Sequence, residues 1–255
     1  MSIPGSASPL FFQTAAAAAA FSVNRSLRFN SADSAYLNKT FSSAGNRKTY
    51  TISFWVKSSN HDDGASVGFG GGQIFSAGTS GSGARTSIGF PGSSGGSNQD
   101  KFVVAHNATG STWATLSSNA VFKDFSAWQH FVVAVDCTQG TASDRVKVYV
   151  NGSQITMSGT YPSNEDQPFN NNVGHAIGRY NAEGKDYFNG YIAEFNFIDG
   201  SQLAATDFGE YDDNNNWNPK EFTGTYGSNG FRLNFSDATS TTTIAEDSSG
   251  NNNDF

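Results

Sequence analysis

The feature that most constrains this chain is the alternation of apolar residues in the stretch Trp128–Gly152. Side chains of a β-strand point alternately to opposite faces, so an apolar residue at every second position predicts a strand with one buried face. Asn151-Gly152 predicts a tight turn after the second of two such segments, because both residues tolerate positive φ. Two antiparallel strands cannot bury their apolar faces alone, so the stretch requires a second sheet. The apolar face of the first segment consists of Phe131, Val133 and Val135, and that of the second consists of Val146, Val148 and Val150. A polar turn at 138–144 separates the two segments.

Further short apolar segments bounded by Gly, Ser and Asn predict strands along most of the chain. The clearest is Tyr50–Val56, in which Phe54 belongs to the apolar face and Trp55 to the opposite face. The 255 residues include 28 Gly and 22 Phe, so turns are frequent and many strands carry large apolar side chains. We therefore predict an all-β fold, an antiparallel β-sandwich over residues 26–255, whose jelly-roll type is implied by the resemblance described below. The other predicted strands are 26–30, 36–41, 101–107, 111–118, 154–161, 173–179, 187–197 and 231–235.

Three polar stretches are predicted to be loops. Residues 58–72 and 78–98 are rich in Gly and Ser and flank short apolar pieces at 73–75 and 86–90. They predict long mobile loops, which in a β-sandwich gather at the ends of the sheets and often carry binding residues. Residues 211–219 (YDDNNNWNP) predict a third, polar loop.

Four segments in order resemble a known family: Ser26–Asn30 (SLRFN), Tyr50–Lys57 (YTISFWVK), the WQH and VKVYVNG motifs of Trp128–Gly152, and Phe188–Phe197 (FNGYIAEFNF). Together they resemble the laminin-G-like or concanavalin A-like lectin family over roughly residues 26–200. The resemblance implies a lectin-like jelly-roll sandwich. In that family a DSSGNxND turn usually precedes the SLRF-type strand, whereas here DSSGNNND comes at 247–254. Residues 211–255 are therefore either a closing tail or the start of a following unit.

The longer wording at 26–41 (SLRFNSADSAYLNKTF) and 188–203 (FNGYIAEFNFIDGSQL) resembles virion proteins of tailed, especially marine, bacteriophages. This resemblance implies a structural protein on the phage particle surface, in a fibre, in the tail or decorating the capsid. It also implies adhesion to host-surface glycans, and a homo-oligomer is expected because virion parts are symmetric. The alternatives are a secreted bacterial carbohydrate-binding module and a glycan depolymerase.

Charge and composition argue against several classes of partner. The net charge is −7 and no run is rich in Lys or Arg, which argues against nucleic acid and against an anionic membrane surface. No apolar stretch reaches the length of about 18 residues needed to cross a bilayer, so membrane insertion is not expected. Cys137 is the only cysteine, so no intrachain disulfide can form.

Residues 1–25 differ from the rest of the chain and predict an N-terminal anchoring arm. No charged residue precedes Arg25, although exposed apolar side chains in this stretch would be costly. The alternatives are a frayed terminus and a secretory signal, for which the positively charged start is missing. The side chains expected to anchor the protein in another virion protein are Leu10, Phe11, Phe12 and Phe21.

The acids Glu194 and Asp199 are the best candidates for a catalytic pair, because sandwich glucanases use paired acids on one face of a strand. These two residues do not share a face, so the second carboxylate is missing and Glu194 is expected to face solvent. The four histidines show no metal-ligand spacing. We expect His130 to bond nearby backbone while Trp128 packs, and we predict that the chain is not an enzyme.

A calcium ion is a possible ligand, because the DSSGNNND run offers several side-chain oxygens and calcium takes six to eight. The alternative is a set of metal-free turns, in which Asp and Asn bond their own backbone. The candidate ligands in this run are Asp247, Asn251, Asn253 and Asp254. Further candidate oxygens lie at Asp62, Asp63, Asp136, Asp212 and Asp213.

Exposed aromatic rings among polar loops predict carbohydrate binding, because ring faces stack on the apolar faces of sugars. For each such ring the alternative is ordinary packing in the core or at a sheet edge. The candidates are Trp113, Tyr161, Tyr180 and Trp217.

Deleting residues 2–23 should leave a soluble, folded sandwich that no longer incorporates into phage particles, because the anchoring side chains are gone. Quantitative mass spectrometry of purified particles checks this expectation. Incorporation at normal copy number would contradict the anchoring arm, and failure to fold would assign the segment to the core of the sandwich.

Overall fold

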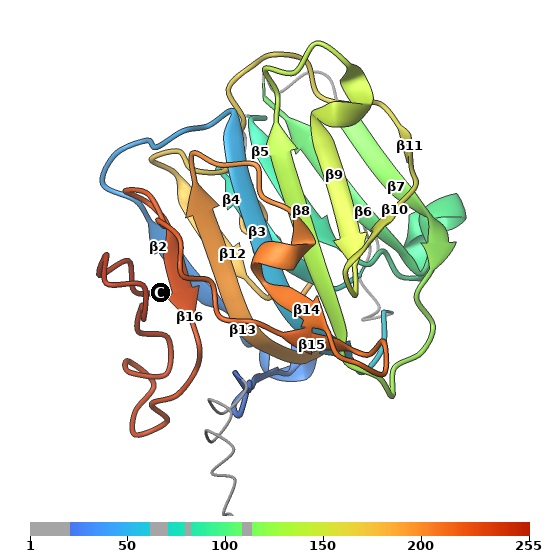
Figure 1. Ribbon diagram of the computed structural model, residues 1–255. Coiled ribbons are helices and arrows are strands. Elements are labelled where there is room, and N and C mark those ends of the chain that lie inside the picture. Colours follow the sequence, from blue (N-terminus) through green and yellow to red (C-terminus); the bar gives the residue numbers. More distant parts are fainter. Residues whose placement is uncertain (1–20, 62–70, 80–82, 109–113) are drawn as a thin grey trace, which may run out of the picture.

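The computed structural model describes residues 21–61, 71–79, 83–108 and 114–255. Within these ranges the chain forms two antiparallel sheets packed face to face, joined by loops and short 3₁₀ turns (Figure 1). The predicted all-β sandwich is therefore confirmed. None of the helical turns in these ranges is long and apolar enough to cross a membrane. Leu10, Phe11 and Phe12 of the predicted arm lie outside the described residues.

The front sheet in Figure 1 contains the alternating segments from which the fold was predicted. β3 lies at its centre, paired with β13 on one side and with β8 on the other. The predicted tight turn joins β9 to β10, with positive φ at Asn151 (47°) and Gly152 (84°). The strands in spatial order are β1 (Leu27–Phe29), β13 (Gly190–Asp199), β3 (Thr49–Ser58), β8 (Gln129–Asp136), β9 (Val146–Val150) and β10 (Ser153–Ile155), and β16 (Phe231–Leu233) also pairs with β13.

The back sheet differs from the sequence-based expectation in two places. β5 falls inside the stretch 78–98 that was predicted to be a loop, but β4 and β6 pair with it on both sides and bury its Ser and Thr residues. The predicted strand 154–161 is two short strands, β10 in the front sheet and β11 in the back sheet. The strands in spatial order are β11 (Met157–Gly159), β7 (Ala114–Val121), β6 (Lys101–Asn107), β5 (Arg85–Gly89), β4 (Gln73–Gly78), β12 (Gly174–Ile177) and β2 (Leu37–Thr40).

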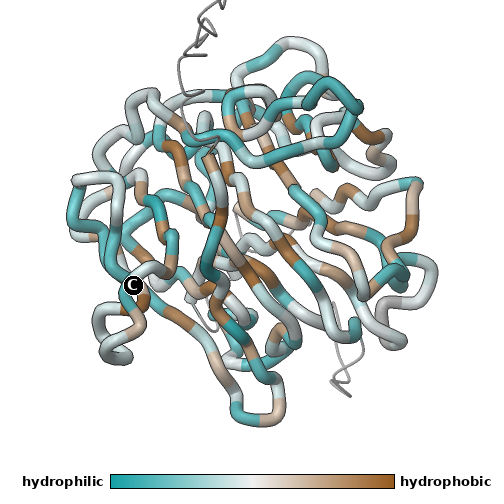
Figure 2. The backbone as a smooth tube through the Cα atoms, turned by 60° about the horizontal axis from the view of Figure 1, so that its bottom comes forward, coloured by the Kyte–Doolittle hydropathy of each residue, from teal (hydrophilic) through white to brown (hydrophobic). Residues whose placement is uncertain are grey.

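Phenylalanine rings fill the space between the sheets. Phe54 of β3 stacks on Phe131 of β8 and on Phe195 of β13, with ring centroids 5.9 and 5.6 Å apart. Between the two sheets, the ring centroid of Phe102 in β6 lies 4.5 Å from that of Phe131, and the ring centroid of Phe75 in β4 lies 5.3 Å from that of Phe195. Figure 2 shows short hydrophobic stretches alternating with hydrophilic ones along the chain. These ring contacts bury large apolar areas and hold the strands in register.

The chain after β13 folds back over the outer face of the front sheet. A short 3₁₀ turn at Ala205–Asp207 leads into a hairpin of β14 (Gly209–Tyr211) and β15 (Trp217–Pro219) (Figure 1). The polar loop predicted for 211–219 is thus a hairpin, because Trp217 packs into a second apolar cluster on this face. We refer to the chain after β13, residues 200–255, as the tail. The buried members of the cluster are Val132 and Ile198 from the sheet and Ala205, Phe208 and Tyr226 from the tail.

The last residues of the chain also pack on the sandwich. β16 pairs with β13 through Phe231 and Phe197. The ring of Phe255 lies 4.6 Å from that of Phe231 and 6.5 Å from that of Phe75 in the back sheet. Residues from both ends of the tail therefore contact the two-sheet core directly.

Buried histidines should make the fold sensitive to acid. Burial lowers the pKa of His106 and His175 from 6.5 to about 4, and that of His130 to about 3. Because the folded-state pKa values are lower, the unfolded chain binds protons first, and stability is lost as pH falls below about 6.5. We expect the free energy of unfolding to fall by up to about 1.4 kcal/mol per pH unit for each histidine. Urea denaturation at pH 7 and pH 5 measures this change in the free energy of unfolding.

The variant His106→Leu provides the control, because neither ring nitrogen of His106 has a hydrogen-bond partner among the described residues. The variant removes one titrating group without breaking a hydrogen bond. Its stability should therefore change less between pH 7 and pH 5 than that of the unmodified protein. An equal change in both proteins would contradict this assignment of the acid sensitivity.

Candidate functional site

The tail leaves part of the outer face of the front sheet uncovered, and this part carries aromatic side chains. Trp55 of β3 faces outward there, with Ala193 of β13 and His130 of β8 directly opposite it on either side. The tail packs instead on the neighbouring outward residues Val132 and Ile198. The small side chain of Ala193 leaves space beside the Trp55 indole.

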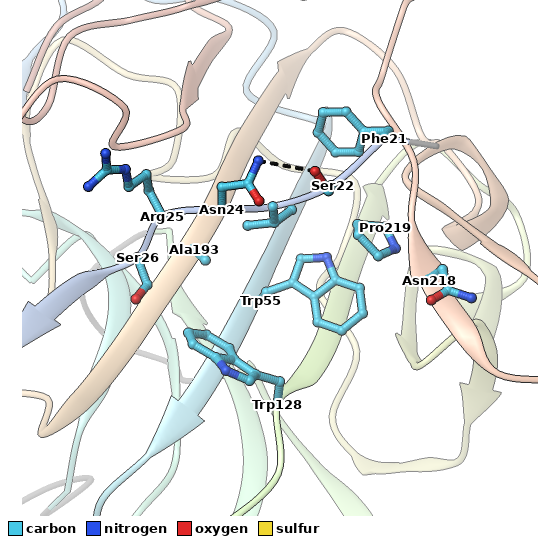
Figure 3. Close-up of a pocket in the computed structure, with 11 residues that line it drawn as sticks. Phe21, Ser22, Asn24, Arg25, Ser26, Trp55, Trp128, Ala193, Asn218 and Pro219 are labelled. Atoms are coloured by element: carbon cyan, nitrogen blue, oxygen red, sulfur yellow. Dashed lines mark hydrogen bonds between the residues drawn. The ribbon is translucent and has the colours of Figure 1, made fainter. Parts of the chain in front are cut away.

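A pocket of about 520 Å³ lies over this part of the sheet (Figure 3). Trp55, Trp128 and Ala193 form its floor, while the segment 21–26 runs along one side of the two indole rings. Both walls carry polar groups that can form hydrogen bonds. The wall residues are Phe21, Ser22, Val23, Asn24, Arg25 and Ser26 on one side and Asn218 and Pro219 of β15 on the other.

Trp55 is supported from one side by a stack of rings. The imidazole of His130 stacks on Trp55 with ring centroids 4.9 Å apart, and Trp217 stacks on His130 at 5.9 Å. Trp217 Nε1–H donates a hydrogen bond to His130 Nδ1 (3.0 Å), so the imidazole proton lies on Nε2 and is donated to Ser53 Oγ (2.8 Å). Burial lowers the pKa of His130 to about 3, so this ring is neutral at physiological pH.

The expectation that His130 bonds nearby backbone was therefore wrong, and Trp128 packs only in part. The imidazole of His130 bonds two side chains rather than backbone, because the chain after β13 brings Trp217 over it. Trp128 is 38% exposed, because it lies just before β8 at the open end of the pocket. Its ring contacts that of Tyr191 with centroids 6.5 Å apart.

Trp217 was predicted to be a sugar platform, and the structure places it in the support of Trp55. Two glycines make room for it: a Cβ added at Gly209 or at Gly152 would collide with the Trp217 ring. The ring of Tyr211 packs on Trp217 at 4.8 Å, and the Tyr211 hydroxyl donates to the Asn151 carbonyl. The hairpin therefore fixes the position of Trp217 against His130.

A family model described as the concanavalin A-like lectin/glucanases superfamily matches residues 29–207. The chain belongs to this family. The floor of the pocket, Trp55, Trp128 and Ala193, lies within the matched residues, but both walls of the pocket lie outside them. The pocket is thus built by adding two segments of this chain to the common sandwich.

Solved structures that match this concanavalin A-like domain have low sequence identity to it. A comparison with curated protein sequences finds no match. A SAP-like pentraxin from Limulus polyphemus has a TM-score of 0.45 and 15% identity, covering 72% of this chain and 76% of that chain. Domains LG4-5 of the mouse laminin alpha1 chain have a TM-score of 0.46 and 10% identity, covering 70% of this chain and 42% of that chain. The CBM40 of the Ruminococcus gnavus IT-sialidase has a TM-score of 0.46 and 13% identity, covering 68% of this chain and 96% of that chain. This chain thus spans less than half of that laminin structure.

Two other predicted sugar platforms of this concanavalin A-like domain, Tyr161 and Tyr180, are not among the residues that line the pocket. Tyr180 is 5% exposed, and burial raises its pKa to about 12. Tyr161 lines a separate hollow of about 270 Å³, together with Gln154 and Met157. Trp113 lies outside the described residues. Sugar binding at Tyr161 stays a prediction, because nothing in the structure tests it.

Glu194 was expected to face solvent, and this expectation was wrong. It lies in a bulge of β13 with a left-handed backbone (φ 46°), and the residue is only 6% exposed. Burial raises the pKa of Glu194, while Arg232 opposes that rise through a 2.6 Å contact from its Nε to Glu194 Oε1. Arg232 Nη1 also contacts Glu221 Oε1 at 2.6 Å. The Glu194 carboxylate is therefore paired.

Asp199, the second acid of the candidate catalytic pair, also has hydrogen-bond partners. The Asp199 carboxylate accepts hydrogen bonds from the backbone N–H groups of Asn46 and Asn229 and from the side-chain amide of Asn170. Across residues 21–61, 71–79, 83–108 and 114–255, no group of three or more His, Cys, Asp or Glu side chains could hold a metal ion.

The predicted calcium ligands at the C-terminal end hold the tail by hydrogen bonds. The Asp247 carboxylate accepts from the backbone N–H groups of Arg232, Ser249 and Asn253. The amide groups of Asn251 and Asn253 donate to backbone carbonyls of residues 227–230, and Asp254 Oδ1 accepts from the Asp247 N–H. Asp136 and Asp212 cap turns, Asp213 is exposed beside one of them, and Asp62 and Asp63 lie outside the described residues. Calcium binding at these residues stays a prediction.

Of the predicted anchoring side chains, the structure describes Phe21. It is half-buried, and the guanidinium of Arg232 lies 5.4 Å from the centroid of its ring. This side chain therefore contacts its own domain at the edge of the pocket.

The two residues that sequence reasoning missed are Trp55 and Trp128. The alternation of Tyr50–Val56 already placed Trp55 on the face opposite the apolar residues. A tryptophan on the outer face of a strand was the available signal. Among the rings chosen instead, Trp217 came from a predicted polar loop, where exposure was expected, and Trp113 and Tyr161 came from the ends of predicted strands.

Replacing Trp217 with Phe should destabilise the domain by about 1–3 kcal/mol, because the ring remains while the buried His130 Nδ1 loses its donor. The free energy of unfolding from urea denaturation measures this loss. Trp128→Phe is the matched control, because its indole N–H makes no hydrogen bond to the described residues and its ring is partly exposed. Equal losses in the two variants would contradict the role of the Trp217 hydrogen bond.

Proposed function

We propose that this concanavalin A-like domain is a glycan-binding, non-enzymatic part of a bacteriophage virion protein, exposed on the particle surface and adhering to glycans of the host surface. The observation that carries the proposal is the pocket with two tryptophan rings on its floor and polar side chains on its walls.

Sugar rings have apolar C–H faces and polar hydroxyl edges, and the pocket offers partners for both. The indoles of Trp55 and Trp128 provide flat faces for stacking. The side-chain amides of Asn24 and Asn218 and the hydroxyl of Ser26 can exchange hydrogen bonds with sugar hydroxyls. A volume of about 520 Å³ lies within the range of small-ligand sites.

Binding without cleavage is supported by the state of the acidic groups. Glycosidases need two carboxyl groups on opposite sides of the bond that is cleaved. Glu194 is paired with Arg232, and Asp199 accepts three hydrogen bonds from its surroundings. Neither residue is among those that line the pocket.

The virion part of the proposal is supported by the resemblance of residues 26–41 and 188–203 to phage virion proteins. The uncharged, apolar stretch before Arg25 supports attachment to other virion proteins. The proposed assembly is a homo-oligomer, because symmetry is the rule for virion parts.

Trp55→Ala should weaken the binding of host polysaccharide about tenfold or more, because truncating a central tryptophan that acts as a hot spot costs about 2 kcal/mol or more. Retention on immobilised host polysaccharide, followed by a titration, measures the loss. Tyr161→Ala is the control at the other hollow and should bind as the unmodified protein does. Loss of binding in Tyr161→Ala alone would move the site to that hollow.

Incubating the protein with host polysaccharide also separates this proposal from a glycan depolymerase and from a purely structural role. Retention without release of oligosaccharides fits the proposal, whereas released oligosaccharides would identify a depolymerase. The absence of both retention and release would leave a purely structural role. Detection of the protein in a culture supernatant free of particles would favour a secreted carbohydrate-binding module.

A further inference from the structure

A second row of outward residues lies next to the pocket on the same face of the front sheet. Tyr191 of β13 is directly opposite Arg28 of β1 on one side and Lys57 of β3 on the other. Because residues two positions apart on a strand share a face, Tyr191 lies on the same face as Ala193 of the pocket floor. We refer to Arg28, Tyr191 and Lys57 as the basic row.

An exposed aromatic surface connects the basic row to the pocket. Trp128 lines the pocket, and its ring contacts Tyr191 with centroids 6.5 Å apart. Both residues are 38% exposed. A sugar chain stacked on Trp55 and Trp128 can therefore continue over Tyr191, whose ring contacts that of Trp128.

The cations of the basic row are not neutralised by carboxylates in direct contact. The Arg28 guanidinium lies 5.2 Å from the centroid of the Tyr191 ring and donates to the Gly190 carbonyl and the Asn189 side-chain oxygen, which are neutral acceptors. Lys57 forms no ion pair within the described residues. The acid that interacts with Lys57 electrostatically is Asp124, whose Oδ1 accepts two hydrogen bonds from Ser126.

This local charge contrasts with that of the whole chain. The net charge is −7, yet the charged residue among those lining the pocket is Arg25, a third cation on this face. Cations around an aromatic platform favour a sugar that carries a negative group, since the ring stacks while a guanidinium or an ammonium bonds the anion.

We propose that the basic row is a second subsite, which binds a sugar ring bearing an anionic group, a carboxylate or a sulfate, beside the ring held by Trp55. The ligand is then an acidic oligosaccharide or polysaccharide of at least two rings. This inference rests on the proposed glycan-binding function and adds the class of glycan. Salt weakens such binding, because the contacts lie at the surface.

The test compares immobilised polygalacturonate and sulfated galactan with a neutral galactan at low and high salt. We expect the protein to bind at least one acidic polymer more tightly than the neutral one, and less tightly as salt increases. Polygalacturonate tests the carboxylate and sulfated galactan the sulfate.

Lys57→Gln should weaken binding of the acidic polymer about two- to fivefold, as expected for an exposed charge contact, and leave binding of the neutral polymer unchanged. Lys101→Gln is the matched control, because Lys101 is also half-buried and makes no ion pair within the described residues, but lies in the back sheet.

Tyr191→Ala should weaken binding of the acidic polymer about three- to tenfold through loss of the platform. Tyr36→Ala is its control, because Tyr36 is equally exposed at 38% and also has an arginine over its ring, yet does not line the pocket. Tyr191→Phe should keep the platform and restore binding.

The outcomes are distinct. If only the neutral galactan binds and Trp55→Ala abolishes that binding, the glycan-binding function stands and the acidic subsite is overturned. If acidic polymers bind but the Lys57 and Tyr191 variants behave like their controls, the subsite is also overturned. If the protein binds neither the acidic polymers, the neutral galactan nor host polysaccharide, the proposed function itself fails.

Discussion

The register of β3 between β8 and β13 is the constraint on which both faces of the front sheet depend. It places Phe54 opposite Phe131, so that their rings stack in the core. The next residue, Trp55, then faces outward between His130 and Ala193. A slip of one residue would exchange the two faces, exposing phenylalanine and forcing tryptophan into a space shaped for phenyl rings. The pairing that closes the core therefore also presents the indole to ligands.

The outer face of the front sheet is divided between the tail and the pocket. The tail covers Val132 and Ile198, and its Trp217 reaches the boundary and supports His130. Beyond that boundary Trp55 is open to the pocket. Because the walls of the pocket come from segments outside the residues matched by the family, membership in the family does not by itself define the ligand.

The ionisable side chains of the interior are held in unreactive states. Burial keeps His106, His130 and His175 neutral at physiological pH, and it raises the pKa of the Cys137 thiol to about 12. Glu194 is buried but paired with Arg232. Three histidines and a thiol that neither gain nor lose protons near neutral pH support a proposal of binding rather than catalysis.

The sequence by itself determined the class of fold, most of the strands and the tight turn at Asn151-Gly152, because alternation and turn chemistry are local properties that each segment carries. The tertiary structure decided which segments share a sheet, since the strand status of β5 and of the hairpin β14–β15 comes from their partners. It also decided the site. The pocket joins residues 21–26, Trp55, Trp128 and Asn218, and a local pattern cannot show which distant segments meet on one face of a sheet.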